Sequence, residues 1–303
     1  MELAKSARTA ALGSTIISLS DGDLTQFFEN PATLDSVKSS DVAVLINPFF
    51  AETASYTIAY VADFKKIGKF AVGLNYVDFG KFERRDASGN LTGEFNANDY
   101  SFFIGKSHRV GPFVMGMNVK LLHSSIASFG STALLSDVGG IFQVNKSWTV
   151  GLTFSNLGGR LSNFNELIES DIPFDVKIGT SFKPEYMPIR FTLTTNNLVQ
   201  DNLIEQEDSE GRSNEQLEKV LRRINIGAEL LLSEHFQLLF GYSHKRKQEL
   251  KLEDISGGAG FSYGIMLNIK KIELRFSRLT YNAAGGTSFI SLRTNLNQFK
   301  SIL

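Results

Sequence analysis

Segments in which apolar and polar residues alternate follow one another along most of this chain. The clearest runs from Phe113 to Leu121, where every second residue is apolar and those between are mostly small or polar. The segments 70–76 and 261–269 repeat the pattern. Successive side chains of a strand point to opposite faces. The pattern therefore predicts strands with one apolar face and one face rich in Gly, Asn and Ser.

About fourteen such segments follow residue 41, and an even number is what single-chain bacterial barrels have. The predicted strands are Asp41–Asn47, Tyr56–Phe64, Lys69–Phe79, Glu94–Ser107, Phe113–His123, Thr132–Gln143, Trp148–Asn156, Phe174–Phe182, Arg190–Asn196, Ile224–Leu232, Phe236–Ser243, Gly257–Ile269, Lys271–Arg278 and Thr287–Leu296.

The links between these strands alternate in length. The tight links are Lys65–Ile67, Arg109–Gly111, Asn145–Ser147, Ser233–His235 and Lys270–Lys271, and the longer ones are Gly80–Thr92, Ser124–Ser131, Leu157–Ile172, Asn197–Leu221 and His244–Ser256. A membrane-spanning β-barrel has this rhythm, because its strands return through tight periplasmic turns and longer outer loops. We therefore predict an all-β fold, a transmembrane antiparallel barrel of about fourteen strands.

Aromatic residues gather near the tight links, as expected for the girdle of a barrel at the membrane interface. They are Phe64, Phe70, Phe113, Phe142, Trp148, Phe182, Phe191 and Phe236. A soluble β-sandwich also alternates and also uses Phe in its strands. It remains an alternative that predicts full solubility without detergent.

Composition agrees with a barrel. The chain has 303 residues, a net charge of -1 and a pI of about 6.5, unlike the high pI of most nucleic-acid binders. No apolar run approaches the roughly 18 residues of a spanning helix. The absence of cysteine excludes disulfides and thiolate sites. No secretory signal is visible, so we expect that the signal peptide has been removed from this chain.

The sequence shows no catalytic or metal-binding motif. The four histidines lack ligand-like spacing, and no glycine-rich loop leaves a strand to open a helix. We expect carboxylates within the strands to form ion pairs across the lumen, because a buried charge needs a partner. The acids are Asp137, Asp175, Glu229 and Glu273, and the candidate partners are Lys120, Lys177, Arg275 and Arg293. We predict a non-enzymatic protein without cofactor or metal.

Two parts of the chain depart from the strand pattern. Residues 1–40 contain turn signals at Asp21-Gly22-Asp23 and Asn30-Pro31-Ala32, because proline fixes its own φ and disfavours helix before it. In the longest link, residues 202–210 are acidic, and Asn214–Arg223 has apolar residues at helical spacing. We expect this short helix to pack on the barrel rim, and the alternative is that it binds a partner.

The N-terminal pattern of Ser6 to Gly13, then Asp21 and Asp23, then Asn30-Pro31-Ala32 resembles the opening of FadL-like outer-membrane barrels. That family includes fatty-acid transporters and the PorV and PorQ proteins of the type IX secretion system of Bacteroidetes. Segments that resemble the PorQ group more narrowly are 76–82, 93–95, 98–100, 119–125, 137–139, 225–230 and 240–242.

The resemblance implies that residues 1–40 form a plug, or hatch, inside a barrel made by residues 41–303. The plug motif maps onto Arg8, Gly13, Asn30, Pro31 and Ala32. The chemistry of these residues suggests a role for each of them. Proline sets a rigid turn and Asn30 can bond its own backbone, Gly13 permits close backbone approach, and Arg8 can donate to carboxylates in the lumen.

The resemblance also implies a role at the bacterial outer membrane. PorQ-like proteins hold the surface protein PorZ, and with the sortase PorU and the barrel PorV they attach secreted cargo to anionic lipopolysaccharide. We therefore expect a PorZ-like partner and no nucleic acid. Candidate partner-binding residues on the outer links are Phe82, Arg84, Arg85, Phe164, Leu217 and Leu221. The alternative is a transporter of a hydrophobic small molecule, which needs an apolar pocket in the barrel, where Phe103 would face inward.

Overall fold

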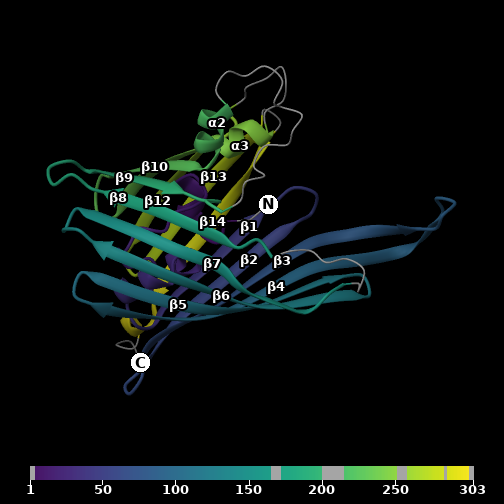
Figure 1. The fold of residues 1–303 in the computed structure, drawn as a ribbon, viewed down its shortest axis with the longest axis horizontal. Coiled ribbons are helices and arrows are strands. Elements are labelled where there is room, and N and C mark those ends of the chain that lie inside the picture. The colour runs from purple at the N-terminus through teal and green to yellow at the C-terminus, as the bar shows by residue number, and fades with distance from the viewer. Residues whose placement is uncertain (1–3, 165–171, 200–214, 251–257, 283–284, 300–303) are drawn as a thin grey trace.

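A computed structural model describes residues 4–164, 172–199, 215–250, 258–282 and 285–299. Within them the strands form one closed antiparallel barrel, in which β1 pairs with both β2 and β14 (Figure 1). The predicted all-β barrel and its strand number are confirmed. The strands are β1 (Asp41–Pro48), β2 (Ala54–Phe64), β3 (Gly68–Arg85), β4 (Leu91–Val110), β5 (Phe113–Ile126), β6 (Phe129–Gln143), β7 (Trp148–Ser162), β8 (Asp175–Phe182), β9 (Ile189–Thr195), β10 (Ile224–Leu231), β11 (Phe236–Ser243), β12 (Phe261–Ile269), β13 (Ile272–Asn282) and β14 (Gly285–Asn295).

Short helices lie before the barrel and in two of its outer links. They are α1 (Ala7–Ala11), η1 (Leu24–Phe28), η2 (Pro31–Ser36), α2 (Glu215–Arg222), α3 (His244–Leu250) and, after β14, η4 (Leu296–Gln298). Across the residues that the structure covers, no helix has the length and apolar character to span a membrane.

The two faces of the strands separate as the sequence pattern predicts. On β5, Met115 and Met117 are exposed on the outer face, whereas Val114 and Asn118 are buried on the inner face. The same alternation runs through β12. Exposed apolar side chains on a closed sheet are the signature of a protein surface that meets lipid rather than water. The β-sandwich alternative is wrong, because the apolar face points out of the barrel.

Aromatic side chains form a band next to the short turns. Phe113 stacks on Phe142 with ring centroids 4.7 Å apart, and Phe182 lies in register with both Trp148 and Phe191. Most members of this band are more than a third exposed. Their position at the strand ends matches an interfacial girdle.

Two of the predicted long links are wrong. Strands β3 and β4 remain paired as far as Arg85 and Leu91, so only residues 86–90 link them. Strands β5 and β6 pair as far as Ile126 and Phe129, which leaves a two-residue turn. Gly80 marks a bulge between Asp78 and Lys81, not the start of a loop, because an isolated glycine in a strand often permits a bulge.

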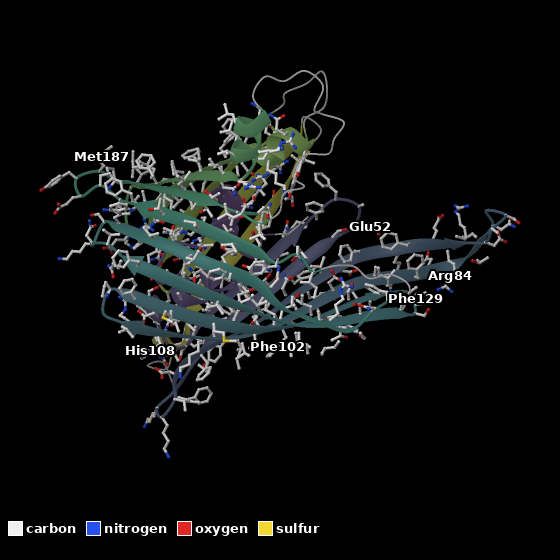
Figure 2. All side chains as sticks on the ribbon, in the orientation of Figure 1. Glu52, Arg84, Phe102, His108, Phe129 and Met187 are labelled. Atoms are coloured by element: carbon white, nitrogen blue, oxygen red, sulfur yellow. The ribbon has the colours of Figure 1, made fainter. Side chains whose placement is uncertain are left out.

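The extended strands project beyond the rest of the barrel (Figure 1). Strand β3 has 18 residues and β4 has 20, whereas about 9–11 residues suffice to cross a bilayer. Figure 2 shows Arg84 and Phe129 toward the far end of this projection. The predicted helix in the longest link is confirmed as α2, and the acidic segment 202–210 lies outside the described residues. Helix α3 was not predicted.

Candidate functional site

The described part of the N-terminal segment, residues 4–40, is almost completely buried. Helix α1 contacts strands β11 to β14, η1 contacts β1 and β2, and η2 contacts β4 to β6. Its partners therefore lie all around the barrel wall. Apolar side chains of the segment pack against the wall, as Phe27 and Phe28 do on Phe103, and hydrogen bonds and ion pairs add to this packing.

Glycines on the inner wall make room for this segment. A Cβ atom on Gly116 would lie 2.4 Å from the Ala32 nitrogen, and one on Gly241 would lie 2.2 Å from the Gly13 nitrogen. Contacts below 3.0 Å essentially do not occur for real Cβ atoms. The glycines on the inner faces of the strands therefore leave room for the backbone of the N-terminal segment. The sequence alternation had predicted that one face of the strands is rich in glycine.

The residues of the plug motif make the contacts that their chemistry predicts. The Asn30 side-chain oxygen accepts from the Ala32 nitrogen at 3.0 Å, and its amide donates to the Ile17 carbonyl at 2.7 Å and the Gly140 carbonyl at 3.2 Å. Pro31 then opens η2. Gly13 has φ of +96° and lies close to the Tyr242 carbonyl, a conformation and an approach that favour glycine.

Arg8 lies at the centre of a buried ionic network. Its guanidinium donates to Glu229 at 2.7 and 3.0 Å and to Asp21 at 2.8 and 2.7 Å. Arg190 bonds the same two acids. The expectation that Arg8 donates to lumen carboxylates is confirmed. Glu229 pairs with Arg8, which was not among the basic residues expected to pair with the strand carboxylates.

The network continues across the neighbouring strands. Arg275 bonds Asp23 of the N-terminal segment and lies 2.8 Å from Glu273, which Arg293 approaches at 3.0 Å. On the other side of the barrel, Lys120 pairs with Asp137 at 2.6 Å. The predicted pairs of Glu273 and Asp137 are therefore confirmed. No cluster of three potential metal ligands occurs in the part of the chain that the structure covers.

An apolar groove lies on the projecting part of β3, β4 and β5. It encloses about 480 Å³ and is lined by Phe79, Phe82, Phe95, Ala97, Asp99, Ser124 and Ile126. Phe82 and Phe95 stack with centroids 5.4 Å apart. Ala97 is buried on the inner side of β4, and Phe95 shares its face. The groove therefore faces the barrel axis and not the lipid side.

Helices α2 and α3 contact each other at the end of the barrel opposite the short turns, where the apolar groove also lies. Glu218 lies 3.0 Å from the His244 Nε2 and 3.3 Å from the Arg222 Nε. Burial alone would raise the pKa of Glu218, but the hydrogen bonds and charges of His244 and Arg222 lower it below its usual value. This contact fixes α2 to the barrel through its polar side.

The apolar side of α2 does not pack on the rim as expected. Leu217 is 55% exposed and Val220 is 54% exposed, while Leu221 is half-buried. Of the other predicted outer-link residues, Phe82, Arg84 and Arg85 lie on strand β3, and Phe164 follows β7 and is half-buried. Only Phe82 joins the apolar groove.

Solved structures with a similar architecture are known. No protein-family model and no curated protein matches the sequence. Among solved structures, the toluene transporter TodX of Pseudomonas putida is similar with a TM-score of 0.56 and 13% identity over 96% of each chain. The fold is that of the FadL-like barrels. A FadL homologue of Pseudomonas aeruginosa has a TM-score of 0.56 and 9% identity over 97% of this chain and 99% of its own.

The monoaromatic hydrocarbon channel CymD is also similar, with a TM-score of 0.55 and 10% identity over 96% of each chain. TodX is named as a transporter and CymD as a channel, and none of these three structures is named as a component of type IX secretion. At such identities the likeness concerns the fold alone. The narrower resemblance to the PorQ group stays a prediction.

Proposed function

We propose that this protein is an outer-membrane barrel that takes up a hydrophobic small molecule. The apolar groove on the inner face of β3 to β5 carries the proposal, because it offers an aromatic binding surface at the end opposite the short turns. TodX and CymD, which share the fold, are named as a toluene transporter and a hydrocarbon channel. The exposed apolar strand faces and the aromatic band support the membrane location.

We propose further that residues 1–40 act as the plug of the barrel formed by residues 41–303. The buried segment fills the space beside the inner wall, and apolar packing together with polar bonds holds it there. Uptake would then require the segment to shift, with the groove as the first binding site.

The groove makes a direct prediction. Phe82→Asn and Phe95→Asn should each weaken the binding of toluene, or of a fluorescent naphthylamine probe, by about tenfold. Burial of an aromatic side chain contributes about 1.5–3 kcal/mol, and about 1.4 kcal/mol corresponds to a factor of ten. Binding would be measured by fluorescence on purified protein in nanodiscs.

The matched control is Lys81→Asn, next to Phe82 on the opposite, outer face of β3, where Lys81 is exposed. It should leave binding unchanged. Equal affinity in all variants would contradict a binding role for the groove, and so would an equal loss in the Lys81 variant.

A second candidate function is to anchor a surface protein, resembling PorZ, beside the sortase PorU, the barrel PorV and lipopolysaccharide. The observation that favours it is the exposed apolar side of α2, formed by Leu217 and Val220. Exposed apolar patches on outer loops are typical of interaction sites. PorQ-like function is a proposal that rests on this surface and on the sequence resemblance.

Mild detergent extraction tests the anchor. If it is correct, the barrel should co-purify with a large surface protein, and Leu217→Asp with Val220→Asp should reduce recovery of that protein at least tenfold. The control Lys219→Asp changes charge on the same helix and should have little effect. Recovery of the barrel alone in several detergents would contradict the anchor.

A further inference from the structure

A polar cavity of about 480 Å³ lies between α3, the N-terminal segment and the outer ends of β10 and β11. Hydroxyl and amide groups form much of its lining: Ser14, Thr15, Asn196, Asn197, Asn225 and Ser243. Asn225 and Ser243 are buried on the inner face of their strands. The cavity therefore lies on the inner side of the barrel wall and not on the lipid side, and it is separate from the apolar groove.

Arg246 of α3 also lines this cavity and is only 6% exposed. Its Nη2 donates to the Ser14 hydroxyl at 2.7 Å, whereas its buried Nη1 has no hydrogen-bond partner. Among the described residues no carboxylate lies within ion-pair distance of it. Burial lowers the pKa of Arg246 to about 10, and Tyr281 opposes this shift.

The other charged groups at the cavity already have partners. Glu29 lies 3.7 Å from the Lys177 Nζ, and Lys245 lies 3.8 Å from Glu249. Arg246 is thus the uncompensated cation of the cavity wall. A buried charge is costly without a partner. A guanidinium presents a planar fork of donors that fits a carboxylate or a phosphate.

We propose that this cavity binds the carboxylate or phosphate group of a small hydroxyl-bearing anion, with Arg246 as the anion-binding residue. The anion would bond the Arg246 guanidinium, and the surrounding amides and hydroxyls would bond the rest of the molecule. This site goes beyond uptake of a hydrophobic molecule, because its lining is polar and its ligand would enter from water.

Thermal unfolding of the full chain in detergent tests the site, with glucuronate and glucose 6-phosphate as probes and glucose as their neutral counterpart. We expect one or both anions to raise the Tm and glucose to leave it unchanged. The carboxylate and phosphate arms show which group the site prefers. Arg246→Met should lose the anion-dependent rise while keeping or raising its own Tm, because an unpaired buried charge has been removed.

Lys247→Met, on the same helix but away from the cavity lining, is the control and should respond as the unmodified chain does. If Arg246→Met fails to fold, Arg246→Lys replaces it and should bind at least about fivefold more weakly, since an ammonium lacks the planar fork. The proposal is overturned if neither anion raises the Tm, if glucose raises it equally, or if the Arg246 variant responds as the unmodified chain does.

Discussion

Arg8→Met is expected to release the N-terminal segment from the barrel and to raise ion conductance in planar bilayers from a closed to an open level. Arg8 is 3% exposed and bonds both Asp21 and Glu229. Removal of one partner from a buried ionic cluster typically costs about 3–5 kcal/mol, because the remaining charge is left uncompensated. Arg190 stays beside both acids but cannot balance them alone.

Arg109→Met is the matched control for this prediction. Arg109 also pairs with the N-terminal segment, at 2.7 Å from Asp35, but it is 39% exposed. Exposed pairs contribute about 0–1 kcal/mol, so this variant should stay closed. Conductance unchanged in Arg8→Met, in protein that still shows the folded band on unheated gels, would contradict the role of Arg8 in holding the segment.

Gly116→Ala is expected to have the second-largest effect. The added Cβ would lie 2.4 Å from the backbone at Pro31 and Ala32, and backbone cannot move aside as a flexible side chain can. Overpacking of this kind costs about 1–3 kcal/mol. The segment should become cleavable near η2 by added protease, while the barrel itself stays intact.

Gly140→Ala provides the comparison on the adjacent strand. Its Cβ would have the Val114 carbonyl at 3.9 Å as its nearest neighbour, an ordinary contact. This variant should resist protease as the unmodified chain does. The same cleavage rate in both variants would mean that the inner glycines are not there to fit the segment.

The barrel and the facing of its strands could be predicted from the sequence, because lipid on one side and a small-residue wall on the other impose a period of two. Arg8 and Asn30 were predicted through the resemblance of the N-terminal motif to a known family, and their side-chain chemistry then suggested a role for each. The barrel prediction depends on local pattern, whereas the prediction for these two residues depends on the family motif.

Features set by contacts between distant segments could not be predicted. The sequence around Gly80 predicts a loop. In the structure Gly80 lies at a bulge, and β3 and β4 pair again beyond it, where Phe82 stacks on Phe95. Helix α3 has six polar residues and then Leu250, without an apolar period, and its contacts are with distant segments, among them the bond from Arg246 to Ser14. The groove and the polar cavity are each lined by residues from several separate segments, so no single stretch of sequence predicts either of them.

Lipid contact of the outer strand faces tests the account most directly, and the absence of native cysteine makes single-cysteine labelling clean. Bimane would be placed at Met117 or Ile265, exposed on the outer faces of β5 and β12, and at Lys146 in a short turn, with the protein in vesicles. Brominated lipid should quench the labels at positions 117 and 265, and aqueous iodide only the label at 146. Iodide quenching at 117 and 265 as strong as at 146, with no effect of brominated lipid, would contradict the membrane-spanning barrel.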